Sequence, residues 1–183
     1  MADRSSPPFR RSLDVLTGTA VALTLVVVMV SVKRLDLYER AYGLTMLRLF
    51  SKTFAIWIGV VFVLFALSVA GLWRHRHWFL PAAAGAGLAT LLVLNAVNPE
   101  AVVVRHNVAH ARAGGRFDPG YLAELSDDAV PALVEAVPHL DTDAQDMVRA
   151  ELCRQPLRPW HGWAASNLSH VGADERRQAF CAF

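Results

Sequence analysis

The sequence predicts an all-α integral membrane protein with three transmembrane helices, an interfacial helix, and a small helical C-terminal tail. Of the 183 residues, 54% are hydrophobic and only 19% are charged, whereas an average soluble domain carries about 25% charged residues. The hydrophobic residues are concentrated in the first hundred positions, and most acidic residues lie beyond Glu100. These observations divide the chain into a polar N-terminal segment (1–12), a membrane domain (13–99) and a tail (100–183).

The first span is predicted over residues 13–32, after a polar and basic segment in which Pro7 and Pro8 disfavour a helix. A run of about twenty hydrophobic residues is long enough to cross a hydrocarbon core of ~30 Å. A basic N-terminus before such a run could also be a secretory signal peptide. Because the run ends at Val32 without a small-x-small cleavage site, we interpret it as an uncleaved helix.

The second and third spans are predicted over residues 53–73 and 79–97. The second contains no charged residue, and the third has Pro81 in its first turn, where the missing amide donor is not needed. The short connection between them combines aromatic residues with Arg74 and Arg76, which is typical of anchors at one membrane surface. The two spans should therefore form an antiparallel hairpin.

The third span is rich in small residues, which let helix backbones approach closely in lipid. Two uses are open: packing between the helices of this chain, and contact with another membrane subunit or a second copy. The small residues are Ala82, Ala83, Ala84, Gly85, Ala86, Gly87 and Ala89.

An amphipathic interfacial helix is predicted over residues 34–50, between the first two spans. Leu35, Tyr38, Tyr42 and Leu49 recur at helical spacing, which suits a helix lying in the head-group region. Gly43 argues against one unbroken helix. The segment could be a connector that follows the membrane surface, or its charged side chains could belong to a polar site. The candidates for such a site are Glu39, Arg40, Arg48 and Asn107.

The tail reads as a series of short helices. Residues 101–113 should extend span three until Gly114-Gly115, and Asp118-Pro119 should open the next helix as an N-cap and a first-turn proline. Residues 126–128 and 141–143 are expected to cap two further helices. Because a core of this size is marginal by itself, we expect the tail to lean on the membrane domain or on a partner.

Neither the motifs nor the composition point to an enzyme. The net charge of +2 gives no overall basic field for nucleic acid. His106 and His110 share one helix face, a spacing that suits a metal, but no further ligand and no HExxH glutamate accompanies them. We therefore predict no catalytic residue, no cofactor and no metal site.

The two cysteines, Cys153 and Cys181, lack CxxC spacing. They could form a disulfide only if the tail folds them together in an oxidising compartment. The sequence favours two free thiols.

Orientation is predicted from the Lys and Arg residues near the spans. One side would receive Arg4, Arg10, Arg11, Arg74 and Arg76. The other would receive Lys33, Arg34, Arg40, Arg48, Lys52, Arg105, Arg112 and Arg116. This count of eight against five favours an external N-terminus and a cytoplasmic tail.

Four ordered stretches resemble a known family. They are LYERAYGLTMLRLF (37–50), NPEAVVVRHN (98–107), YLAELSDDAVPAL (121–133) and WAASNLS (163–169). The region of about 15–170 is similar to the C-terminal part of the bacterial multi-pass membrane family catalogued as domain of unknown function 4173. The resemblance implies a bacterial inner-membrane protein that corresponds to the last three spans of typically longer members, without an established activity.

Two functional hypotheses follow. The first is a structural or protein-docking membrane module without catalysis, whose partners are the bilayer and another membrane protein or a second copy. The second is a truncated or split part of a larger multi-pass transporter or membrane enzyme. In that case Glu39, Arg40, Arg48 and Asn107 would line a site.

Overall fold

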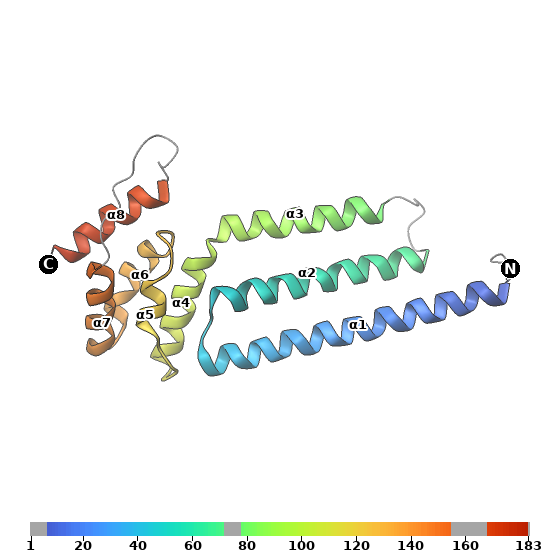
Figure 1. Cartoon of the computed structure of the whole chain (residues 1–183), viewed down its shortest axis with the longest axis horizontal. Helices are drawn as coiled ribbons and strands as arrows, with labels where there is room; N and C mark the ends of the chain where they lie inside the picture. Colours follow the sequence, from blue (N-terminus) through green and yellow to red (C-terminus); the bar gives the residue numbers. More distant parts are fainter. Residues whose placement is uncertain (1–6, 72–77, 155–167, 183) are drawn as a thin grey trace. The chain divides into compact units, whose positions relative to one another are not determined.

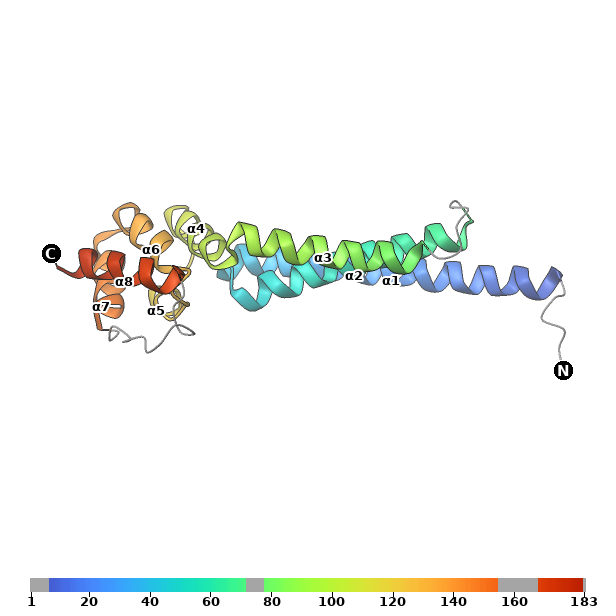
Figure 2. The same cartoon turned by 90° about the horizontal axis from the view of Figure 1, so that it is seen from above.

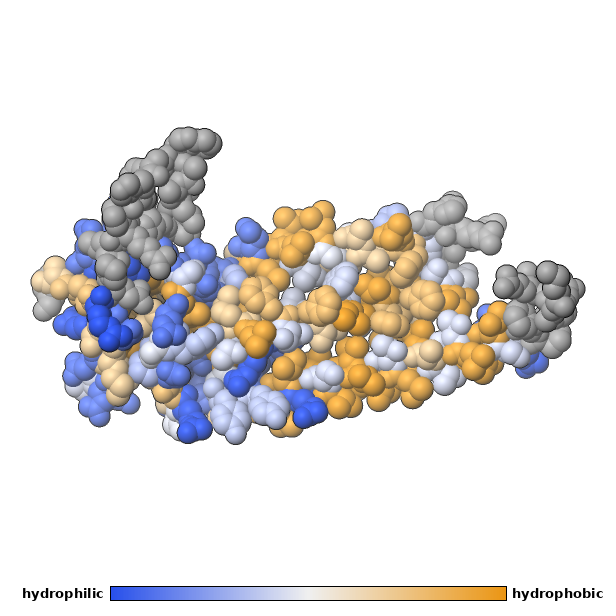
Figure 3. All heavy atoms as spheres, viewed as in Figure 1, coloured by the Kyte–Doolittle hydropathy of each residue, from blue (hydrophilic) through white to orange (hydrophobic). Residues whose placement is uncertain are grey.

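The computed structural model describes residues 7–71, 78–154 and 168–182, with side chains from Arg11 onward except those of residues 168–171. Every regular element in these ranges is a helix, which confirms the predicted all-α class. Three helices are long and apolar enough to cross a membrane, which confirms the three spans: α1 (Pro7–Tyr42), α2 (Met46–Val69) and α3 (Phe79–Val97). They run side by side in two views (Figures 1 and 2), and apolar residues dominate the face seen in Figure 3.

The spans differ from the predicted ones at several ends. α1 begins at Pro7, because proline is well tolerated in a first helical turn, so the expectation of a non-helical N-terminal segment was wrong from that residue on. α3 covers the predicted range, 79–97. α2 ends at Val69, four residues before the predicted end. The predicted turn with Arg74 and Arg76 lies outside the described residues.

The separate interfacial helix predicted over residues 34–50 is also corrected. Residues 34–42 complete α1, and residues 46–50 form the first turn of α2. The chain turns at Gly43, whose φ of +75° is a left-handed conformation that glycine adopts readily at the end of a helix. An amphipathic pattern therefore continued across two helix ends, and only the glycine marked the break.

The chain divides into two compact units, and each is described by itself: unit 1 is residues 1–37 and 50–93, and unit 2 is residues 38–49 and 94–183. In unit 1, Lys52 Nζ lies 2.6 Å from Asp36 Oδ1 and joins α2 to α1. Gly87 in α3 lies against the indole of Trp57, so that an added Cβ would be 3.3 Å from Nε1. At this position the small side chain serves packing within the chain.

The described residues of unit 2 form five further α-helices and one short 3-10 helix. α4 (Pro99–Arg112) is a separate helix and not the predicted extension of span three, because Asn98 adopts φ 51° and Pro99 follows it. The Asn98 side chain caps α4 by accepting a hydrogen bond from the amide of Ala101, at 3.1 Å. The remaining helices are α5 (Pro119–Ala123), α6 (Val130–Ala136), η1 (Val137–His139), α7 (Thr142–Arg154) and α8 (Leu168–Cys181).

Two of the predicted caps are present and one is corrected. Asp118 accepts from the amide of Tyr121 at 3.0 Å, and Asp141 accepts from the amide of Ala144 at 2.8 Å, as expected for N-caps. α6 instead begins after Ala129, without a side-chain cap. The hydroxyl of Ser126 accepts from the amide of Asp128 within the preceding turn. The polar residues before α6 therefore stabilise a turn and not the helix start.

The core of unit 2 is apolar, and α6 packs against α4, α5 and α8. Leu44, from the connector between α1 and α2, is 4% exposed and belongs to this core. The largest fully buried side chains are Val103, Val104, Leu122, Leu133, Val148 and Leu152. The tail therefore packs on the connector between α1 and α2. Its dependence on the membrane domain or on a partner stays a prediction.

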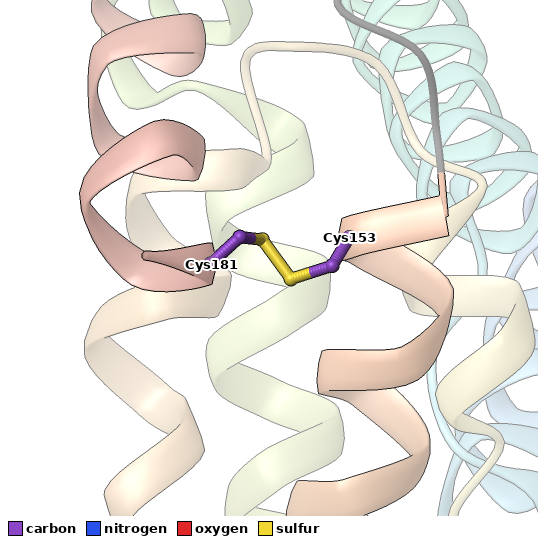
Figure 4. The surroundings of a disulfide bond; sticks show 2 residues. All are labelled: Cys153 and Cys181. Atoms are coloured by element: carbon purple, nitrogen blue, oxygen red, sulfur yellow. A yellow bond between two sulfur atoms is a disulfide. The ribbon is translucent and has the colours of Figure 1, made fainter. Parts of the chain in front are cut away.

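The end of unit 2 is cross-linked. Cys153 at the end of α7 and Cys181 at the end of α8 form a disulfide, with their Cα atoms 5.7 Å apart (Figure 4). The prediction of two free thiols was wrong, because α7 and α8 pack together and bring residues 28 positions apart to bonding distance. Nothing in the local sequence around either cysteine indicates this pairing.

Candidate functional site

The connector between α1 and α2 makes a tight turn whose backbone is held by side chains of the tail. A buried backbone amide or carbonyl without a partner is costly, so such groups are paired in folded proteins. In the turn from Gly43 to Thr45 no helix supplies these partners for Leu44. They come instead from a residue more than sixty positions away in the chain.

Asn107, on α4, provides both partners. Its Oδ1 accepts from the amide of Leu44 at 3.0 Å, and its Nδ2 donates to the carbonyl oxygen of Leu44 at 2.7 Å. The same Nδ2 donates to the carbonyl oxygen of Val103 at 2.9 Å, one turn back along α4. Asn107 is only 8% exposed, and its amide bonds the Leu44 backbone much as a neighbouring β-strand would.

Two further side chains, those of Tyr121 and Arg48, bond the same turn. We call the turn at residues 43–46 and the side chains that bond it the junction. The Tyr121 hydroxyl, on α5, accepts from the amide of Met46 at 2.8 Å, which fixes the start of α2. Arg48 Nη1 donates to the carbonyl oxygen of Gly43 at 2.7 Å, and its guanidinium carbon lies 5.9 Å from the centre of the Tyr42 ring. The carbonyl groups directly after α1 and the first amide of α2 thus receive partners from side chains.

The predicted site residues are distributed over this junction. Asn107 and Arg48 hold the turn, and Glu39 Oε1 lies 3.5 Å from Nε2 of His106, on α4. Arg40 is exposed on the last turn of α1. The structure therefore brings Glu39, Arg48 and Asn107 together around the connector and α4. Their use as a ligand site stays a prediction.

An open cleft of about 440 Å³ lies beside the junction, in unit 2. Aromatic rings, the turn backbone and one cation surround it. Its lining residues are Tyr42, Leu44, Thr45, Asn107, Arg116, Phe117, Asp118, Pro119 and Tyr121. The polar groups of Asn107, Asp118 and Tyr121 at this cleft already bond backbone amides, so they mainly support the fold.

Residues 1–136 match the model of one protein family, described as domain of unknown function (DUF4153). The chain belongs to this family. The family number differs from the 4173 suggested by the motifs, but both describe a domain of unknown function, and the three spans make this DUF4153 member a multi-pass membrane protein. Searches of the curated proteins and of the solved structures each gave no match.

For this DUF4153 member, the chemistry of the junction is that of a backbone clamp. Within the described residues no group of three or more His, Cys, Asp or Glu side chains could hold a metal ion, and His106 and His110 belong to no such group. The hydrogen-bonding atoms of Asn107 and Tyr121 point at main-chain atoms of the connector. The arrangement holds the turn between α1 and α2 against α4 and α5.

Several residues of the junction escaped the sequence prediction. Leu44 was not singled out, because it lay off the apolar stripe of the expected interfacial helix, yet it is the buried residue of the turn. Tyr121 stood only within a family-like motif, and His106 was considered only with His110 as a spacing that suits a metal. Gly43 was the available signal, since a glycine inside a helical pattern marks a helix end. The contact with α4 needed the tertiary structure.

Proposed function

We propose that this protein is a non-enzymatic module of a bacterial inner membrane whose unit 2 docks another protein at the bilayer surface. The observation that supports this is the clamp from Asn107 and Tyr121 to the backbone at Leu44 and Met46. A preorganised surface loses little conformational freedom on binding, which favours affinity. Unit 2 offers such a surface, because it has its own apolar core and its side chains bond the turn between α1 and α2.

Photo-crosslinking in living cells tests the docking proposal. A photoreactive amino acid would replace Met147, an exposed apolar side chain of α7, and, as a control, Leu91, an exposed side chain of α3. We expect one defined protein adduct from position 147, and only lipid or no adduct from position 91. The adduct should be lost when Asn107→Leu disrupts the clamp and kept with Arg105→Ala, which changes an exposed neighbour on α4.

The proposal fails if position 147 gives no adduct in full-length chains that resist proteolysis as the wild type does. It also fails if the adduct persists unchanged in the Asn107→Leu variant after unit 2 has lost its protease resistance. The first result would remove the partner, and the second would remove the need for a preorganised surface.

A second candidate function is that of one part of a larger transporter or membrane enzyme. It is favoured by α2 and α3, which contain no buried residue, and by a groove of about 540 Å³ in unit 1. Small residues line this groove together with Asp14 and Thr17. A carboxylate near the end of a span is costly unless hydrated or paired, and small residues permit close helix contact. The small residues of the groove are Gly18, Ala22, Ala66 and Ala70.

Native electrophoresis in a mild detergent distinguishes the two candidates. If further membrane helices occupy the groove, the wild-type chain should migrate as a larger assembly that Ala66→Leu disrupts. Ala20→Leu, the same change at an exposed position of α1 outside the groove, should leave the assembly intact. A second test uses Glu39→Ala and Arg48→Ala: full complementation of a deletion strain by both variants would argue against a ligand site at the junction.

A further inference from the structure

We infer that unit 2 lies on the oxidising, non-cytoplasmic side of the membrane, where the bond between Cys153 and Cys181 is a permanent part of its fold. This orientation is opposite to the one that the charge count alone favours. The inference goes beyond the docking proposal and does not depend on it.

The first argument is the disulfide. Cys153 and Cys181 are the only cysteines of the chain, and their Cα separation of 5.7 Å is ordinary for a disulfide. Bonds of this kind persist in oxidising compartments and are rare in the cytoplasm, where thiols are kept reduced. A cytoplasmic tail would therefore hold the two residues as thiols.

The second argument is that the fold itself brings the two cysteines together. Ala173 of α8 is fully buried, Arg177 of α8 lies 3.4 Å from Asp127 before α6, and the Arg149 guanidinium on α7 lies 5.0 Å from the centre of the Phe180 ring. α8 is therefore held against α6 and α7 by contacts that precede the cross-link along the helix. The bond joins surfaces that already pack, as expected for a structural disulfide.

The positive-inside rule by itself favours the opposite orientation. It counts Lys and Arg in short loops and within about 15–20 residues of the span ends, so the count stays at eight on the side of unit 2 against five on the other. The disulfide outweighs this margin of three charges, because a bond between these two cysteines would not persist in the cytoplasm.

The connector is consistent with this orientation. Residues 38–49 and 94–183 form one compact unit, so the chain between α1 and α2 and the chain after α3 lie on the same side of the bilayer. A chain that crosses three times leaves its ends on opposite sides.

Oxidation of the two thiols releases two protons and two electrons, and a thiol-oxidising protein of that compartment accepts them as its own disulfide is reduced to a dithiol.

Thiol trapping in cells tests the redox state. Cells that express the full-length chain would be quenched with acid, denatured, and treated with a maleimide that carries a polymer of defined mass. We expect no adduct without reduction and two adducts per chain after reduction. Cys153→Ser and Cys181→Ser, each alone, should give one adduct without reduction. Two adducts on the unreduced wild type would overturn the inference.

Reporter fusions test the orientation without relying on the bond. Alkaline phosphatase fused to the C-terminus of the full-length chain should be active, and green fluorescent protein at the same place should be dark. The same result is expected for the double variant Cys153→Ser, Cys181→Ser, since the disulfide forms only after unit 2 has reached the oxidising side and therefore does not set the orientation. A fluorescent fusion with an inactive phosphatase would overturn the inference, whatever the thiols show.

Discussion

At the scale of single residues, Asn107 is the side chain that makes the most hydrogen bonds at the junction. It satisfies the amide and the carbonyl of Leu44, a residue that is 4% exposed. An apolar replacement would leave both groups buried without a partner, and each unsatisfied group costs about 1–3 kcal/mol. The polar side chain is therefore required by the backbone it faces.

Asn107→Ala should lower the free energy of unfolding of unit 2 by about 2–4 kcal/mol, because the Leu44 backbone loses both partners. Pulse proteolysis in detergent across a urea series measures this change. Arg105→Ala, on an exposed position of the same helix, should change it by less than about 0.5 kcal/mol. Equal effects of the two variants would contradict the proposed role of Asn107.

Gly43 and Gly114 form a matched pair at which the cost of a left-handed backbone can be separated from the cost of overlap with a neighbouring side chain. Both have positive φ, +75° and +81°, but a Cβ at Gly43 would overlap Asn107 Oδ1, whereas a Cβ at Gly114 meets no atom within 4 Å. Gly114→Ala should therefore cost only the left-handed conformation, about 1–2 kcal/mol. Gly43→Ala should cost at least about 2 kcal/mol more, because the clamp is displaced.

The same proteolysis assay compares the two glycine variants. Supporting evidence would be a clearly larger loss of stability for Gly43→Ala, together with faster cleavage near the connector. If the two variants are equally stable, the clamp does not hold the turn.

At the scale of elements, α8 is attached to the rest of unit 2 by a buried cation as well as by the disulfide. Arg177 is 6% exposed, and its guanidinium nitrogens lie 3.4 Å from Asp127 Oδ1 and 3.6 Å from Asp174 Oδ1. Removing one partner of a buried pair is strongly destabilising, since the remaining charges lose the group that neutralises them. The docking of this helix therefore depends on its charge pattern.

Arg177→Met should weaken the docking of α8 by about 3 kcal/mol, near the lower end for buried pairs, because both carboxylates keep some access to water. Hydrogen exchange of the α8 amides would report the loss directly. Arg176→Met, at the exposed neighbouring position, is the control and should leave exchange unchanged. Equal exchange rates of the α8 amides in the two variants would show that Arg177 does not hold the helix.

Reduction of the disulfide should also lower the stability of unit 2. The cross-link joins residues 28 positions apart, and loop closure of this length restricts the unfolded chain by about 3–4 kcal/mol. A thermal melt of the detergent-purified protein should shift downward with a reductant. The double variant Cys153→Ser, Cys181→Ser should melt at the lower temperature with or without reductant, and a shift in that variant would point to another cause.

At the scale of the whole molecule, the tail is not an independent segment of sequence. Unit 2 takes residues 38–49 from between two spans, and Leu44, Met46 and Leu49 pack against its core. A core of this size is marginal, so the connector adds apolar burial and occupies the polar groups of Asn107 and Tyr121. The fold of unit 2 therefore depends on a segment that lies between two spans in the sequence.

A chain limited to residues 98–183 should accordingly be less stable than unit 2 in the full-length protein. We expect weaker amide protection throughout α4 and α5 in hydrogen exchange, and partial recovery when a peptide of residues 38–49 is added. A peptide with Leu44→Asp should give no recovery, since a charged side chain cannot replace the buried leucine. Full protection of the isolated tail would contradict this dependence.

Local signals in the sequence determined the class and most of the elements. Hydrophobic runs of membrane length identified three spans, and the third matched from Phe79 to Val97 because proline and asparagine mark its ends. Asp118 and Asp141 announced helix starts, since capping depends only on neighbouring residues. These features arise within a few residues of chain, so periodicity and composition suffice to find them.

The tertiary structure alone decided what is joined to what. The bonds from Asn107 to Leu44, from Tyr121 to Met46 and from Cys181 to Cys153 connect residues far apart in sequence. Their formation depends on the packing of whole helices, which no local pattern encodes. An amphipathic stripe over residues 34–50 therefore predicted one surface helix, whereas packing against α4 selected two helix ends and a buried turn. The three spans follow from local patterns in the sequence, whereas the clamp and the disulfide depend on how the helices pack.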